Sequence, residues 1–133
     1  MPRHTATALL IVALAALARP AHAHHSFAAE YDAQTVVALK GVVTKVEWTN
    51  PHAYIYIDVA DGDGKVANWA FEGMAPGVLY RAGWRKDSMK VADVVTVKGY
   101  LARDGSKLVN MQSALLADGR NLFVGQQPAS KGH

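Results

Sequence analysis

The central third of the chain alternates between two kinds of side chain, and this alternation constrains its local structure. From residue 53 to residue 59, tyrosine and aspartate take every second position, and isoleucine and valine follow them. A period of two is that of a β-strand with one buried face. Residues 61–65 (Asp-Gly-Asp-Gly-Lys) accept positive φ readily, which is typical of a tight turn. Residues 66–72 then return as a second strand, so the pattern predicts an antiparallel hairpin.

Further strands are predicted on both sides of the hairpin. Residues 36–48 are a long β-branched run with Gly41 in its middle, which predicts a bent strand that serves two sheets. Residues 75–84 predict one short helix, because Pro76 suits the first helical turn and Gly83 suits the exit. The remaining predicted strands are residues 91–101, residues 108–116 and a short segment at 121–124.

Together these elements predict a mainly all-β domain. Five strands with one short helix between the third and the fourth is the order of a small OB-like antiparallel barrel. A small antiparallel sandwich is the alternative, and the place of the single helix favours the barrel. Which face of the first strand lies inside stays open, because a bulge at Gly41 shifts the alternation by one residue.

The N-terminus has the layout of a secretory signal. Arg3 precedes a ten-residue apolar run, and small residues stand at the −3 and −1 positions of a cleavage site after Ala23. Cleavage after Ala18 is the alternative. The run is too short to cross a bilayer, which takes about 20 residues. The predicted organisation is a signal peptide (1–23), an extended N-terminal arm (24–35), an OB-like β-barrel domain (36–125) and a disordered tail (126–133), in an exported, periplasmic protein without a membrane span.

Charge and cysteine content exclude several functions. Loss of Arg3 and Arg19 with the signal leaves 12 of the 14 basic residues, against 11 acidic ones. This near-neutral balance, without a basic run, argues against nucleic-acid binding. The chain has no cysteine, which excludes disulfides, thiolate metal sites and haem attachment through cysteine.

The predicted cleavage site places a histidine at the mature N-terminus. The α-amino group and Nδ1 of His24 would chelate one metal ion, and His52, at the turn after Asn50-Pro51, would add a second imidazole. His25 is the alternative partner. Such a nitrogen set suits Cu(II). Glu30, Asp32, Glu72 or Tyr54 are candidates for the remaining positions. The competing interpretation is that His24 is simply a polar residue after the cut and that His52 hydrogen-bonds its own turn.

Two other groups of residues are candidates for a binding site. The aromatic residues around the second and third strands and the helix either pack in the core or form a stacking face for a neutral or sugar-like ligand; they are Trp48, Trp69, Trp84, Tyr54, Tyr56 and Tyr80. Glu72, just before the helix, is either a structural acceptor or a ligand carboxylate. Arg81 and Arg85 are its candidate ionic partners.

Four motifs resemble those of a family of small exported bacterial proteins of unknown function. They are His-His-Ser-Phe at 24–27, Gly-Val-Val-Thr-Lys-Val-Glu-Trp-Thr-Asn-Pro-His at 41–52, Trp-Ala-Phe-Glu at 69–72 and Leu-Tyr-Arg-Ala-Gly-Trp at 79–84. The resemblance implies export, a single small β domain and no assigned activity. It also implies one shared site at the barrel rim, because these motifs contain His24, His25, Asn50, His52, Glu72 and Arg81. One departure is Ala92, where the family would have a Gly-Asp turn.

The favoured hypothesis is a non-enzymatic, exported binding protein that holds a copper ion through His24 and His52. The first alternative is an accessory module that binds a small organic ligand or a periplasmic partner protein. Its candidate contact residues are Asn50, Glu72, Arg81, Trp48, Trp69 and Tyr54. The second alternative is a copper-dependent oxidase that uses the same histidines.

Overall fold

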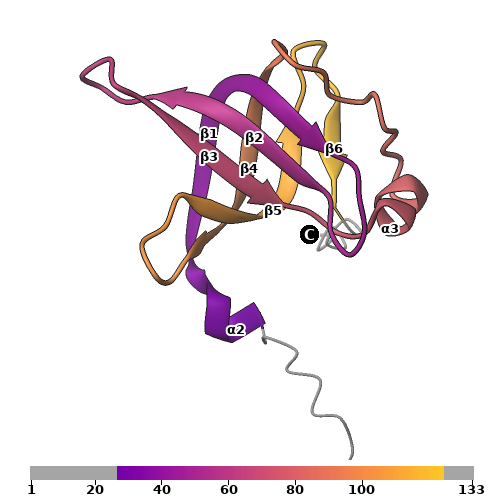
Figure 1. Cartoon of the computed structure of the whole chain (residues 1–133), viewed down its shortest axis with the longest axis horizontal. Helices are drawn as coiled ribbons and strands as arrows, with labels where there is room; N and C mark the ends of the chain where they lie inside the picture. Colours follow the sequence, from indigo (N-terminus) through magenta and orange to yellow (C-terminus); the bar gives the residue numbers. More distant parts are fainter. Residues whose placement is uncertain (1–26, 125–133) are drawn as a thin grey trace, which may run out of the picture.

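The computed structural model describes residues 27–124 (Figure 1). The predicted signal peptide and tail, and with them His24, His25 and His133, lie outside the described residues. The elements in chain order are α2 (Phe27–Glu30), β1 (Tyr31–Glu47), β2 (Tyr54–Ala60), β3 (Val66–Glu72), α3 (Pro76–Arg81), β4 (Val94–Ala102), β5 (Leu108–Leu115) and β6 (Asn121–Phe123). The predicted all-β class is confirmed, as is the single helix between the third and fourth strands.

The strands form one sheet that closes on itself. Its order is β3-β2-β1-β4-β5-β6, and an additional pairing of β3 with β5 completes a five-stranded ring. Figure 1 shows the strands wrapped around one another, with α3 on one side and α2 below. The pairing is antiparallel except at the closure of the ring, where Ala70 to Glu72 pair in parallel with Leu108 to Asn110. β6 adds a sixth strand along β5.

The long strand β1 pairs with two neighbours within one sheet, in place of the two sheets that Gly41 predicted. Its first part pairs with β4 as far as Val42, and from Val42 onward it pairs with β2. A side chain at Gly41 would overlap the backbone carbonyl of Asp58. Glycine therefore allows β2 to approach at the point where β1 changes partner.

The N-terminal arm differs from the extended segment predicted for it. Residues Phe27–Glu30 form one helical turn, and β1 begins at Tyr31, five residues earlier than predicted. Tyr31 pairs with Ala102 of β4, and the register shifts between Tyr31 and Val36. Asp32 spans this irregularity, because its carboxylate accepts hydrogen bonds from Thr35 Oγ1 at 2.7 Å and from the Gln34 amide at 2.9 Å. These bonds lower the Asp32 pKa.

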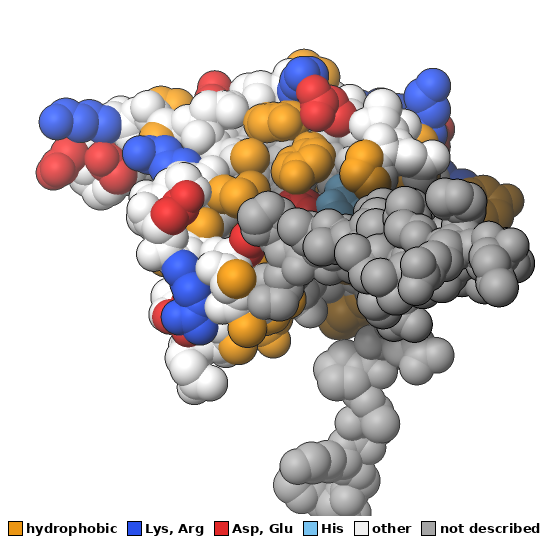
Figure 2. All heavy atoms as spheres, turned by 60° about the horizontal axis from the view of Figure 1, so that its bottom comes forward, with side chains coloured by type: hydrophobic (Ala, Val, Ile, Leu, Met, Phe, Trp, Pro, Cys, Tyr) orange, Lys and Arg blue, Asp and Glu red, His pale blue; other side chains and the backbone are white. Residues whose placement is uncertain are grey.

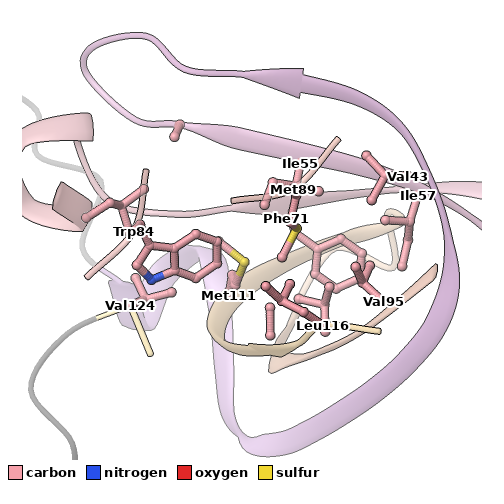
Figure 3. Packing of buried hydrophobic residues seen from close by; sticks show 14 of the residues in the cluster. Val43, Ile55, Ile57, Phe71, Trp84, Met89, Val95, Met111, Leu116 and Val124 are labelled. Carbon is pink, nitrogen blue, oxygen red and sulfur yellow. The ribbon is translucent and has the colours of Figure 1, made fainter. Parts of the chain in front are cut away.

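The core fills the inside of the ring and confirms the alternation of the central hairpin. Ile55, Ile57 and Phe71 point inward and are at most 4% exposed, whereas Tyr54 and Tyr56 lie on the outer face. Figure 3 shows Phe71 in the middle of the cluster, with Trp84 next to Met111. The Trp84 indole donates a hydrogen bond to the Phe123 carbonyl at 2.7 Å, so its buried N–H is satisfied. Within residues 27–124, the helices are all too short to cross a bilayer.

Candidate functional site

A buried glutamate on the outer face of the sheet is the centre of the candidate site. Glu72 is the last residue of β3, and its side chain points away from the core because its neighbour Phe71 points inward. It is only 9% exposed and is the one buried charged residue in the described part of the chain. Burying a carboxylate is costly unless donors surround it. Its donors therefore define the site.

His52 is the first of these donors. Its Nδ1 lies 2.6 Å from Glu72 Oε1, and its side chain is 45% exposed. The contact follows from sheet register. Tyr54 pairs with Glu72, and the ladder continues through the Ala53 amide, which donates to the Met74 carbonyl at 2.9 Å. His52 is thus a diagonal neighbour of Glu72 on the same face. A neutral His52 ring that donates from Nδ1 to this carboxylate keeps the Nε2 lone pair for a ligand.

Tyr31 is the second donor, and no sequence motif singled it out as a site residue. Its hydroxyl donates to Glu72 Oε2, so each carboxylate oxygen has its own donor. Tyr31 is 2% exposed. Burial, and next its hydrogen bond to the Glu72 carboxylate, raise the pKa of the Tyr31 phenol. The sequence holds one chemical signal for the Tyr31–Glu72 contact. A carboxylate that is predicted to end a strand needs hydrogen-bond donors, and Tyr31 has a phenol hydroxyl shortly before the start of a predicted strand.

Two further tyrosines extend the site along β2. Tyr54 lies directly across from Glu72, and its ring stacks with that of Tyr56 at 6.3 Å between centroids. Burial and then the charge of Glu72 raise the pKa of Tyr54. The Tyr56 hydroxyl donates to Glu47 at 3.2 Å, and Lys45 lies over the Tyr56 ring. This part of the face is polar, aromatic and half-buried.

The structure does not bring the other candidate residues to Glu72. Arg81 lies exposed on α3, and Arg85 stacks over Tyr80 with its guanidinium carbon 3.9 Å from the ring centroid. Neither arginine forms an ion pair with Glu72 in the described residues, so the suggested ionic partners were wrong and His52 and Tyr31 take their place.

The remaining candidates are distributed between the turn and the core. Asn50 is exposed in the turn before His52, and its peptide bond to Pro51 is cis. Trp48 and Trp69 are partly buried and pack against the core, and Trp84 is 1% exposed. The three tryptophans therefore serve mainly as packing, and the aromatic part of the outer face consists of tyrosines.

A family of unknown function (DUF6152) matches residues 11–110 of the chain. The chain belongs to this family. Comparisons with characterised proteins and with solved structures give no match. The matched residues include the strands, turn and helix around His52 and Glu72, and the family has no assigned activity.

In this DUF6152 protein, the described residues supply one oriented imidazole and lack a complete metal site. No group of three or more histidine, aspartate or glutamate side chains within residues 27–124 is placed to hold a metal ion. Figure 2 shows a pale-blue histidine side chain beside acidic and hydrophobic side chains on this face, and His52 is the one histidine within residues 27–124. A metal ion at Nε2 would therefore need side-chain ligands beyond those that residues 27–124 bring together.

Proposed function

We propose that the protein is an exported, periplasmic copper-binding protein in which His52 and the mature N-terminal His24 hold one Cu(II) ion. The observation that carries this proposal is the 2.6 Å contact between His52 Nδ1 and the buried Glu72 carboxylate. Metal-ligating histidines commonly donate their second ring N–H to a carboxylate, which fixes the tautomer and increases the basicity of the other nitrogen. His52 thus offers Nε2 as a ligand that is oriented in advance.

His24 supplies the other nitrogens in this proposal. Cleavage after Ala23 frees its α-amino group, so amine and imidazole can chelate one ion in the planar arrangement that Cu(II) favours. His24 lies three peptide bonds before Phe27, which limits the distance between their Cα atoms to about 11 Å. Phe27 contacts the Tyr31 ring, and the Tyr31 hydroxyl binds Glu72. The segment therefore starts from the cluster that holds His52.

In this proposal, Glu72 contacts Nδ1 of His52, where it orients the ring and increases the basicity of Nε2. Its second oxygen is already taken by the Tyr31 hydroxyl, and the carboxylate is almost excluded from water. A buried carboxylate that accepts two hydrogen bonds has little freedom to rotate, so the His52 imidazole that contacts it is restrained as well. The proposal is one of binding, with no reaction assigned to the site.

The test is a Cu(II) titration of protein that begins at His24, followed by electron paramagnetic resonance and by competition with a chelator of known affinity. His52→Ala and a version with one extra residue before His24 should each weaken binding at least about tenfold and change the nitrogen hyperfine pattern. Glu72→Gln should weaken it about 10- to 100-fold, which is the usual effect of losing an outer-shell partner. His25→Ala is the matched control and should leave the affinity unchanged.

Two results would contradict the proposal. Copper affinity that ignores both the His52→Ala substitution and the N-terminal extension would show that the ion binds elsewhere. A loss on His25→Ala equal to that on His52→Ala would show that the ligand set includes His25, the alternative partner of His24, and is not the one proposed. Near-ultraviolet circular dichroism of each metal-free variant separates a lost ligand from a lost fold.

A further inference from the structure

A small groove lies on the outer face of the sheet, over β1, β4 and the end of β5. Its volume is about 290 Å³. The side chains that matter for its chemistry are those of Lys40, Val94, Thr96, Leu115 and Ala117. None of its lining residues belongs to β2 or β3, the strands next to His52 and Glu72. Ligand pockets begin at about 300 Å³, so the groove has room for one small ligand.

The register of the sheet brings these side chains together. Lys40 pairs with Thr96 across β1 and β4, and Thr96 pairs with Leu115 across β4 and β5. Because residues directly opposite one another project from the same face, these three form one row across three strands. Val94 stands two residues before Thr96 and shares its face, where it pairs with Val42 of β1. One cation, one hydroxyl group and three apolar side chains therefore meet at this corner of the sheet.

The apolar part of this corner is open to solvent. Val42 and Val94 are each 42% exposed, and Leu115 is 45% exposed. Single exposed hydrophobic side chains are common on protein surfaces, whereas adjoining ones beside a groove are typical of a binding site. An alkyl chain placed against Val94 and Leu115 would remove apolar surface from water on both sides of the contact. The groove therefore favours a ligand with an aliphatic part.

Lys40 determines the charge of that ligand. The ion pairs within residues 27–124 are those of Lys45, His52 and Arg120. Lys40 therefore has no ion-pair partner in the described part of the chain. None of the residues that line the groove is acidic. A single cation beside an apolar groove is complementary to a ligand with one anionic group at the end of an aliphatic chain.

We propose that the groove binds a free aliphatic monocarboxylate with a short alkyl chain, that is, a short-chain fatty acid. Its carboxylate pairs with the Lys40 ammonium and accepts a hydrogen bond from the Thr96 hydroxyl, and its alkyl chain lies against Val94 and Leu115. The small volume limits the ligand to one short chain. This is a second site, and it does not depend on copper at His52.

The test is a titration of the ¹⁵N-labelled, metal-free protein with butanoate, pentanoate and hexanoate, followed by NMR. The amide signals of Thr96, Leu115 and Ala117 should shift and then saturate. Affinity should increase about fourfold for each added methylene that becomes buried. Hexanol has the alkyl chain of hexanoate without the carboxylate, so it should bind more weakly than hexanoate.

Two variants and their matched controls assign the contacts. Lys40→Gln should weaken hexanoate binding about fivefold, the upper effect of an exposed ion pair, and leave hexanol binding unchanged. Leu115→Asp places a carboxylate in the groove and should abolish hexanoate binding. Lys98→Gln and Val36→Asp are the controls, because both residues are exposed on the same face outside the groove. Both should keep the wild-type affinity, and the amide spectrum of each variant reports whether it is folded.

Three results would overturn the inference. In the first, hexanoate shifts none of the groove amides or shifts them without saturation. In the second, hexanoate and hexanol bind equally and Lys40→Gln changes neither, so the corner is an apolar surface without selectivity for an anion. In the third, the groove amides broaden as the concentration of ligand-free protein rises and Leu115→Asp removes the broadening, so a second copy of the chain covers this face.

Discussion

Removal of one hydroxyl group from the buried cluster should destabilise the protein by a measurable and specific amount. Tyr31→Phe keeps the ring, which packs against Phe27, and deletes the donor to Glu72 Oε2. Glu72 is 9% exposed, so water cannot fully replace the lost donor. Hydrogen bonds to charged groups contribute about 1.5–3 kcal/mol. We therefore expect the free energy of unfolding to fall by about 2 kcal/mol.

The matched control is Tyr56→Phe. It deletes the same chemical group from a tyrosine on the same face, where the hydroxyl donates to the partly exposed Glu47 at 3.2 Å. Water can take over that bond, so the expected loss is at most about 0.5 kcal/mol. The difference between the two variants isolates the effect of burial.

Urea unfolding followed by tryptophan fluorescence provides the assay, since Trp84 is buried and should report loss of the core. A change in midpoint at constant slope measures the stability difference. For a domain of this size, 2 kcal/mol corresponds to a decrease in Tm of about 10 °C. Equal stability losses in Tyr31→Phe and Tyr56→Phe would refute the reasoning that Glu72 depends on Tyr31.

Three further predictions concern pH and backbone geometry. In the unfolded chain the Tyr31 phenol ionises near pH 10.0, whereas in the folded protein its pKa is raised. The stability advantage of wild type over Tyr31→Phe is therefore complete below pH 10 and should shrink by about 1.4 kcal/mol per pH unit above it. Urea unfolding of both proteins at pH 9 to 11.5 measures this change. A Cβ at Gly99 would overlap the Asn110 carbonyl, so Gly99→Ala should lower the free energy of unfolding by about 3 kcal/mol. The control Gly62→Ala should change it by almost nothing, because the surroundings of Gly62 are open. Similar stability losses in the two variants would contradict the close approach of β4 and β5. Ala92 has a φ of +78°, so Ala92→Gly should raise Tm and stabilise the protein by about 1 kcal/mol, and a decrease in stability would show that this turn is not strained.

Several parts of the fold could be predicted because their causes are local. The alternation around Tyr54 and Tyr56 placed those side chains on the face opposite Ile55 and Ile57, and the structure has them there. Gly41 marked the bend of β1 because only glycine allows the approach of β2. Ala92, flagged as a departure from a Gly-Asp turn, has the positive φ that glycine would adopt more easily.

The candidate site could be predicted only in part. The family resemblance placed His52 and Glu72 in one shared site, but no local pattern predicted their direct contact, and the predicted ionic partners of Glu72 were Arg81 and Arg85, on and just after α3. The contact between His52 and Glu72 arises from the diagonal relation across β2 and β3, which depends on the register of the hairpin. The copper-binding role of His24 remains a prediction, since that residue lies outside the described part of the chain.

By itself, the sequence determined the strands, the turns and the two faces of the hairpin, since periodicity and backbone preferences act over a few residues. Tertiary structure alone decided three other features: the parallel pairing of β3 with β5, the helical turn at Phe27–Glu30, and the bond from Tyr31 to Glu72, which are 41 residues apart. The pairing and the Tyr31–Glu72 bond depend on closure of the ring, which brings the start of β1 back to the end of β3, whereas the helical turn depends on contacts with Arg103, the residue after β4. A buried carboxylate must be surrounded by donors, but only the closed sheet determines which donors can reach it.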